Sequence, residues 1–290
     1  MGIFRTGPSS LCSLPLRCCP VTDVNTTADP ETPLAYYVPV GPGVYRPTVH
    51  VQGAWQETEQ HMAPISGLIA HELAIHDQRD DMQIGRICFE ILGMIPLQES
   101  TIHVETIRPG RTIELLEATL TIGGRTIIRA RAWRLAVADM SELAGNELPA
   151  MPSPDGTEEI DGTLEWPGGY IRSLQLQAVP GGREGRRQVW IRTDCALIDG
   201  VEAAPIAAYT MLVDTANGIA TRVRPTELMF PNVDLTLHFV REPDPALIGL
   251  DTSVTFGSTG LGLTSSVLND VHGPVGRVEQ CLTVRHFPTR

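Results

Sequence analysis

The sequence predicts an α+β fold in which one arrangement, a helix followed by a run of antiparallel strands, occurs twice. Apolar runs headed by Ala-Pro-Ile begin at Ala63 and again at Ala204. Each is followed by segments rich in β-branched residues, separated by Gly, Pro or polar turns. The order of segments is the same in both halves of the 290-residue chain, a length typical of about two domains.

In the first half, strand-like alternation begins at Tyr36, and a polar loop leads into a helix expected from Ala63 to about His76. Four strand segments follow, "QIGRICFEILG", "STIHVETIRPG", "RTIELLEATLTIGG" and "RTIIRARAWRLAVAD". The two glycines of "IGGR" at 122–125 are typical of a tight hairpin. We therefore expect an N-terminal domain over residues 34–140, preceded by a poorly ordered leader over residues 1–33.

Residues 141–165 are rich in Pro, Gly and acidic residues without a sustained period, so they predict a linker. Beyond it, "YIRSLQLQAV" and "RQVWIRTDCAL" read as strands, and residues 204 to about 217 read as the second helix. Four further strand segments complete a C-terminal domain over residues 166–288: "NVDLTLHFVRE", "LIGLDTSVTFG", "LGLTSSVLND" and "VGRVEQCLTVRHF".

The two halves can be aligned residue by residue. The helices match at an offset of 141 residues and the strands at an offset of 148. Three apolar positions of the first half, Leu73, Ile84 and Ala132, then correspond to Asp214, Asn232 and Gln280. An unpaired polar group in a core costs on the order of 1–3 kcal/mol, so three together predict a site. The alternative is that Asp214 is a solvent-facing helix residue, Asn232 a turn residue after Pro231 and Gln280 an outward-facing strand residue.

Charge and cysteine usage limit the partners. The formal net charge is −12, which disfavours nucleic acid, and no apolar run approaches the ~18 residues that cross a bilayer. Cys88, Cys195 and Cys281 stand alone in predicted strands, as reduced core cysteines of a cytoplasmic protein do. The edge strands of the expected sheets could pair with a second copy of the chain, so a homo-oligomer is possible.

"NVDLTLHFVREP", followed about forty residues later by "GPVGRVEQCLTV", carries a family resemblance. With the doubled helix-and-sheet pattern, it resembles the acyl-CoA thioesterase II type over roughly residues 36–287. The resemblance implies a double hotdog fold, two repeats each with a long helix wrapped by an antiparallel sheet. It also implies hydrolysis of acyl-CoA to fatty acid and CoA in lipid metabolism, without a metal or bound cofactor.

The same resemblance implies that Asp214, Asn232 and Gln280 hold the attacking water, with Asn232 where the family has a threonine. Oxyanion donors are expected near Ile65, Ser66 and Gly67, where "HMAPISG" replaces the family's Gly-Gly-Gln opening. His61 is a further candidate there, against a role as a loop or capping residue.

Two further features of the sequence concern the CoA moiety and the type of reaction. "GGREGRRQ" places Arg183, Arg186 and Arg187 together, as a CoA-phosphate site or a solvated hairpin tip. Hotdog folds also host hydratases and dehydratases that use an aspartate and a histidine. An enoyl-CoA hydratase and a non-catalytic acyl-CoA-binding protein are therefore the alternative functions.

Overall fold

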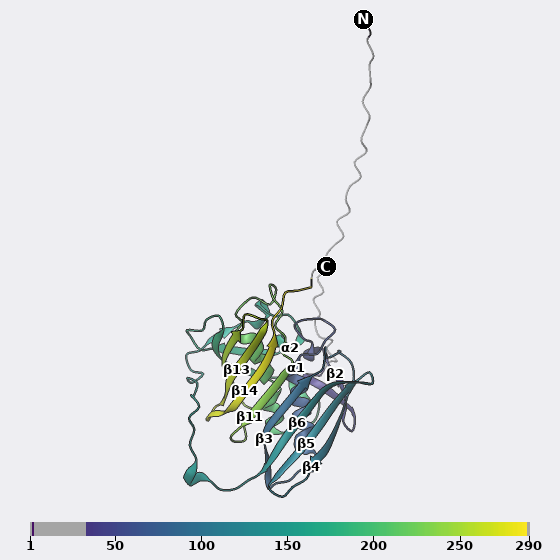
Figure 1. Ribbon diagram of the computed structural model, residues 1–290, viewed down its shortest axis with the longest axis vertical. Coiled ribbons are helices and arrows are strands. Elements are labelled where there is room, and N and C mark those ends of the chain that lie inside the picture. Colours follow the sequence, from purple (N-terminus) through teal and green to yellow (C-terminus); the bar gives the residue numbers. More distant parts are fainter. Residues whose placement is uncertain (1, 3–32, 289–290) are drawn as a thin grey trace.

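One continuous sheet forms most of the protein. The computed structural model describes residue 2 and residues 33–288, so the predicted leader lies almost entirely outside the described residues. The sheet has fourteen strands in the order β10-β1-β2-β4-β5-β6-β3-β11-β14-β13-β12-β9-β8-β7. All neighbouring strands are antiparallel except the parallel pair β1 and β10. Figure 1 shows the central strands side by side, from β4 to β13.

The first half supplies six strands and the second half eight. The first six are β1 (Ala35–Gly41), β2 (Val44–Pro47), β3 (Met82–Ile91), β4 (Ser100–Arg108), β5 (Ile113–Ile122) and β6 (Arg125–Ala136). The others are β7 (Glu158–Ile160), β8 (Leu174–Ala178), β9 (Arg186–Thr193), β10 (Ala196–Ile198), β11 (Asp234–Phe239), β12 (Ile248–Phe256), β13 (Leu261–Asp270) and β14 (Gly273–Thr283). Gly123 and Gly124 both have positive φ between β5 and β6, as the hairpin prediction requires.

The halves meet at β3 and β11, and the register there reproduces the offset read from the sequence. Cys88 of β3 pairs with Thr236 of β11, which lies 148 residues later. Outward from this seam, β6, β5 and β4 follow β3 in the order in which β14, β13 and β12 follow β11. The pairs Ile84–Arg134 and Asn232–Leu282 also differ by 148 at both positions. The strand alignment is thereby confirmed.

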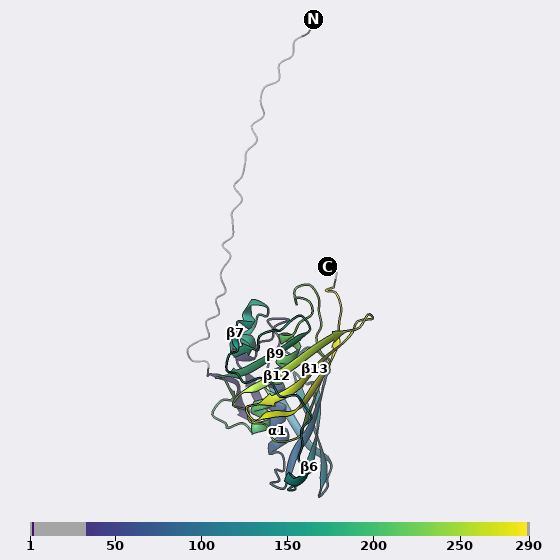
Figure 2. The same cartoon turned by 90° about the vertical axis from the view of Figure 1, so that its left-hand side faces the viewer.

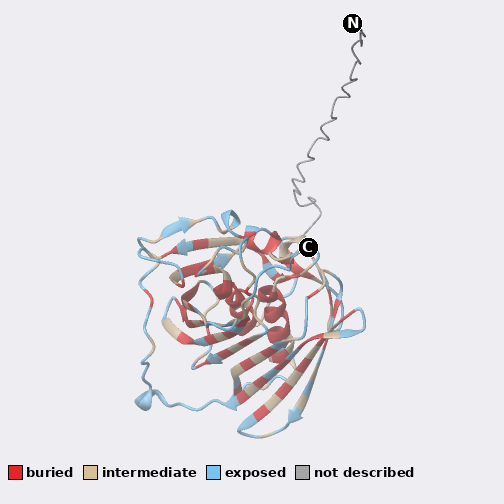
Figure 3. Cartoon of the chain, turned by 45° about the horizontal axis from the view of Figure 1, so that its top comes forward, coloured by how far each residue is buried: buried red, intermediate tan, exposed pale blue. Residues whose placement is uncertain are grey.

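The first predicted helix is α1 (Met62–Ile75), and it is buried along most of its length. A helix that is apolar on nearly every side belongs inside a protein, and Figure 3 shows the buried helices in the middle of the molecule. Figure 2 shows the sheet from its side, with α1 lying against it. Among the described residues, no helix is long and apolar enough to cross a membrane.

The second helix is broken where the sequence predicted a continuous one. It consists of α3 (Pro205–Thr210), the 3-10 turn η4 (Val213–Thr215) and α4 (Ala216–Ile219). The break lies where α1 crosses the second helix. The two helices are so close there that a Cβ on Gly67 of α1 would lie 2.4 Å from the Cβ of Met211. Close backbone packing at the crossing thus coincides with a turn that starts one residue before Asp214.

Two further expectations differ from the structure. Tyr170 and Ile171, predicted in a strand, belong to the short helix α2 (Gly169–Arg172), because Gly168 has φ of 114° and turns the chain against residues 49–53. Cys281, predicted in the core, is exposed on β14. Side chains alternate along a strand, so its exposure accompanies the burial of Gln280.

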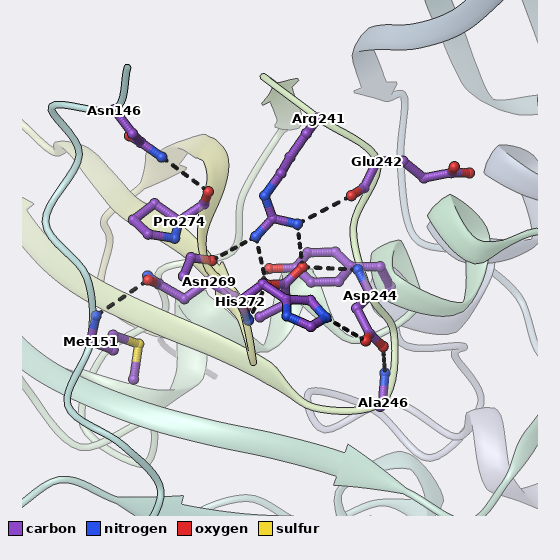
Figure 4. Close-up of polar contacts among 12 residues, drawn as sticks. Asn146, Met151, Arg241, Glu242, Asp244, Ala246, Asn269, His272 and Pro274 are labelled. Carbon is purple, nitrogen blue, oxygen red and sulfur yellow. Dashed lines mark hydrogen bonds and ion pairs between the residues drawn. The ribbon is translucent and has the colours of Figure 1, made fainter. Parts of the chain in front are cut away.

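The segment between the halves is fastened to the second half. It contains the 3-10 turns η2 (Ser141–Leu143) and η3 (Gly162–Leu164) with β7 between them. Figure 4 shows the Asn146 amide donating to the carbonyl of Pro274, and the backbone N–H of Met151 donating to the side chain of Asn269. Nearby, the Arg241 guanidinium donates to both carboxylate oxygens of the buried Asp270 at 2.6 Å, and this holds the pKa of Asp270 low.

Candidate active site

Asp214 is a carboxylate buried between the second helix and the sheet. It lies in η4, at the break in the second helix, and only 5% of its surface is exposed. Asn232 precedes β11. Gln280 lies on β14, and the side chain of Gln280 is completely buried. The structure therefore brings together the three polar residues that replace apolar ones in the aligned half.

The amide side chains bind one oxygen of the carboxylate. Nδ2 of Asn232 and Nε2 of Gln280 each donate to Oδ1 of Asp214 at 2.8 Å. Oδ2 of Asp214 and the amide oxygen of Gln280 remain as acceptors, and the latter is buried without a hydrogen-bond donor from the described residues. Because a buried acceptor without a donor is costly, this arrangement favours a small donor such as water beside the carboxylate.

Burial sets the acidity of the site. Removal from water raises the pKa of Asp214 from 3.8 to about 6, although the hydrogen bonds from Asn232 and Gln280 favour the charged form. A carboxylate with a pKa near 6 is ionised at neutral pH and is a stronger base than an exposed one. The pKa of Asp214 is thus suitable for a general base at neutral pH.

His61 reaches the same carboxylate from the first half of the chain. It is the N-cap of α1, and its Nδ1 accepts the backbone N–H of Ala63 at 3.1 Å. The same nitrogen lies 3.5 Å from Oδ2 of Asp214. Burial lowers the pKa of His61 to about 3, so the ring is neutral and its proton is on Nε2. The ring packs on Tyr170 with centroids 4.2 Å apart.

Asp214, Asn232 and His61 face a cavity of about 700 Å³, whereas Gln280 is completely buried and does not line it. Asp214, Asn232, His61 and Met62 line it, and its other walls are mostly apolar. Trp55 and Trp166 lie edge to face there, with ring centroids 5.0 Å apart. A cavity with a few convergent polar groups and apolar walls is typical of a site for a largely apolar small molecule.

The three residues expected as oxyanion donors do not line this cavity. Ile65, Ser66 and Gly67 are buried inside α1, and the Ser66 hydroxyl donates to the carbonyls of Ala63 and Thr210. The helix begins earlier than those residues, at Met62, which lines the cavity. The amide of Ala63 is capped by His61 and Pro64 has no N–H, so the first-turn amide free for a ligand is that of Met62.

The three arginines of the predicted phosphate site are separated by strand geometry. Arg186 turns toward the buried Asp251, to which its guanidinium donates, and it also donates to the carbonyl of Thr252. Arg187 follows it on β9 and lies on the opposite face, where it lines the main cavity. Arg183 is exposed in the preceding turn and lies beside a smaller adjoining cavity.

Several wall residues were not identified from the sequence. Trp55 ends the strand-like stretch that begins at Tyr36, but the structure places it in a loop, because the strand there stops at Pro47. Trp166 and the β7–η3 segment line the cavity although they lie next to or within the predicted linker. A wall formed by loops depends on tertiary packing, which the pattern of apolar residues does not reveal. Among the described residues, no group of three or more His, Cys, Asp or Glu side chains is arranged to hold a metal ion.

Two family models match the chain, one in each half. Residues 51–135 match the family described as acyl-CoA thioesterase N-terminal domain, and residues 146–284 match the acyl-CoA thioesterase C-terminal domain. No curated protein sequence matches the chain.

Solved structures share the fold at low sequence identity. The acyl-CoA thioesterase II TesB2 from Mycobacterium marinum has a TM-score of 0.64 at 16% identity, covering 89% of this chain and 97% of its own. A hotdog-fold protein of unknown function from Alicyclobacillus acidocaldarius has a TM-score of 0.67 at 13% identity, covering 85% and 93%. A TesB protein from Mycobacterium avium subsp. paratuberculosis has a TM-score of 0.59 at 15% identity, covering 86% and 95%.

The large, mostly antiparallel sheet is thus of the hotdog type. The two family matches together span most of the chain, one in each half. The chain therefore belongs to the acyl-CoA thioesterase family, a family of thioester hydrolases.

Proposed function

We propose that this protein hydrolyses acyl-CoA thioesters to a free carboxylic acid and CoA, with Asp214 as the general base. The observation that carries the proposal is the polar cluster around Asp214, which lines the mostly apolar cavity. Asp214 Oδ1 is held by two amides, while Oδ2 and the Gln280 amide oxygen remain as acceptors. A water that donates one hydrogen to each would direct a lone pair at a carbonyl carbon.

The proposed reaction proceeds in two steps that use only water and protein groups. The water oxygen attacks the thioester carbonyl while its proton moves to Oδ2 of Asp214. The tetrahedral intermediate collapses, the carbon–sulfur bond breaks, and the proton passes from Asp214 to the departing thiolate. The backbone N–H of Met62 and Nε2–H of His61 would stabilise the negative oxygen of the intermediate, since both belong to residues on the cavity wall.

The fold supports a shared site. We propose a double hotdog in which each half supplies one central helix, the second of them broken, and the sheets join at β3 and β11. Met62 and His61 come from the first half, and Asp214, Asn232 and Gln280 come from the second. One complete site would thus require both halves, and the apolar residues at Leu73, Ile84 and Ala132 would leave the symmetry-related position without a base.

Thiol release from a panel of acyl-CoA thioesters of different chain length tests the proposal. We expect CoA release with at least one member of the panel. The Gln280→Met variant keeps the side-chain volume but removes both polar groups, so we expect its kcat to fall by a factor of ten or more. A protein that binds these thioesters but releases no thiol would be an acyl-CoA-binding protein, and the proposal would be wrong.

The His61–Asp214 contact supports one second candidate, hydration of an enoyl-CoA. A hydratase needs an acid and a base facing the two carbons of a double bond, and the two side chains are 3.5 Å apart. Loss of the enoyl absorbance without thiol release would support this candidate. Thiol release with the double bond intact would leave hydrolysis as the activity.

A further inference from the structure

A second, basic cavity adjoins the main one, beside the hairpin between β8 and β9. Its volume is about 150 Å³, and it shares Glu165, Arg187 and Ile219 with the walls of the main cavity. Four arginines line it, together with the carboxylates of Glu165 and Glu184: Arg183, Arg187, Arg222 and Arg224. The basic cavity thus lies next to the main cavity, which Asp214 lines.

The guanidinium groups of this cavity are available to a ligand. Among the described residues, none of the four arginines has a carboxylate oxygen within 4.0 Å, whereas Arg79, Arg131, Arg134, Arg186 and Arg241 each form an ion pair. Arg183 and Arg222 donate to the backbone carbonyls of Glu184 and Val254, which leaves further N–H groups on each. In a chain with net charge −12, four arginines without ion pairs around one cavity are an unusual concentration of positive charge.

The charge elsewhere at the rim has the opposite sign. The segment from β7 to η3 contributes Glu159 and Asp161 to the wall of the main cavity. A polyanion would be repelled on that side and attracted on the arginine side. Arg285 is the other arginine on the main cavity, and it donates to the hydroxyl of Thr283.

We infer that the cavity formed by Arg183, Arg187, Arg222 and Arg224 binds a phosphate group of the CoA moiety while the acyl group lies in the main cavity. This inference rests on the proposed thioesterase function. Arginine N–H groups bind phosphate oxygens by charge-assisted hydrogen bonds, and a compact cavity with four of them suits a single phosphate group. Two of the four, Arg222 and Arg224, come from the loop after the second helix and were not part of the phosphate site predicted from the sequence.

The inference is tested by comparing thioesters with the same acyl group and different thiols. The substrates are the acyl-CoA, its 3′-dephospho analogue and the N-acetylcysteamine thioester, which carries no phosphate. For Arg224→Glu, we expect the KM for acyl-CoA to rise at least tenfold with little change in kcat. The same variant should hydrolyse the N-acetylcysteamine thioester as wild type does, because that substrate does not reach the arginines.

Arg125→Glu is the matched control. Arg125 is exposed at the start of β6 and outside both cavities, and its variant changes the net charge by the same amount. An equal rise in KM for Arg125→Glu would assign the effect to overall charge and overturn the inference. So would an equal loss for Arg224→Glu on the N-acetylcysteamine thioester.

The 3′-dephospho analogue identifies the phosphate. A penalty for Arg224→Glu that disappears with this analogue assigns the cavity to the 3′-phosphate, and a penalty that persists assigns it to the diphosphate. A wild-type protein that cleaves no thioester would remove the proposed function itself. A wild-type protein that cleaves every thioester, with Arg224→Glu behaving as wild type on all of them, would remove only the phosphate site.

Discussion

Asp214 shows how a single buried carboxylate links activity to pH. Its folded-state pKa is about 6, because burial opposes the charge more strongly than the two amide hydrogen bonds support it. In the proposed reaction the ionised form is the base, so we expect kcat/KM to fall as pH drops through about 6. The pH dependence of kcat/KM on a fixed acyl-CoA measures this limb directly.

The hydrogen bond from Asn232 should influence the pH at which kcat/KM falls. Its amide donates to the charged form, so Asn232→Ala should raise the pKa of Asp214 further and move the acidic limb to higher pH. Asn217 is the matched control, since it lines the same cavity but donates to the carbonyl of Phe230 instead. Asn217→Ala can change the rate, but the pH at which its kcat/KM falls should equal that of the wild type. An unmoved limb in Asn232→Ala would contradict the assignment of the limb to Asp214.

The same burial makes Asp214 costly for stability. Its folded pKa lies above the ordinary value of 3.8, so the stability of the protein falls as pH rises from about 4 through about 6. In Asp214→Asn the amide nitrogen would face Nδ1 of His61, and the cost of a buried charge disappears. We expect this variant to be more stable than wild type by up to roughly 3 kcal/mol above pH 7, with the difference vanishing below about pH 4. Urea unfolding at several pH values measures the difference, and equal gains at all pH values would contradict a charge effect.

Asp214 lies at a break in the second helix that coincides with its crossing of α1. Gly67 of α1 approaches Met211 so closely that a methyl group has no room. In most helices Gly→Ala stabilises by about 0.5–1 kcal/mol, but here we expect Gly67→Ala to destabilise by roughly 1–3 kcal/mol. Gly145→Ala is the control, because a Cβ at Gly145 meets no atom within 4 Å. A neutral or stabilising Gly67→Ala, measured by urea unfolding, would contradict the tight crossing.

The elements also show which parts of the site a sequence can predict. The convergence of Asn232 and Gln280 follows from the repeat, since the strand offset of 148 is a property of the sequence that the sheet register reproduces. The separation of Arg186 from Arg187 also follows from the alternation of side chains along a strand. The first feature follows from the offset between the two halves, and the second from the two-residue period of a strand.

The remaining parts depend on tertiary packing. The break in the second helix arises at its crossing with α1, and the helix propensities of residues 211–215 do not mark it. The start of α1 at Met62 depends on capping by the His61 side chain, which moves the free amide to the cavity. The wall at Trp166 comes from a loop with no periodic signal, and at Trp55 the alternating pattern was misleading, because that residue lies in a loop. "TRVRP" at 221–225 did carry a signal, two arginines beside a proline, that sequence reasoning passed over.

At the scale of the whole molecule, the two halves are held by the pairing of β3 with β11, by the parallel pairing of β1 with β10 and by the contact of α1 with α3. Cleavage of the connection between the halves should therefore leave them together. We expect a chain with a protease site inserted at Gly145 to stay as one particle by size-exclusion chromatography after cutting, and to keep thioesterase activity. Separation of the pieces in native buffer, without denaturant, would contradict a shared core.

The shared core also bears on the number of active sites. Asp214 and Gln280 belong to the second half, while His61 and Met62 approach from the first, so the proposed site needs both halves. The first half keeps Leu73 and Ala132 buried at the aligned positions, where they serve packing.

The rate of CoA release by Asp214→Asn, compared with wild type on the best acyl-CoA at pH 7.5, tests the role of Asp214 most directly. General-base catalysis contributes about 10²- to 10⁴-fold, so we expect kcat to fall within that range while the variant stays folded and binds the thioester. A folded Asp214→Asn variant that releases CoA at the wild-type rate would contradict the assignment of Asp214 as the base.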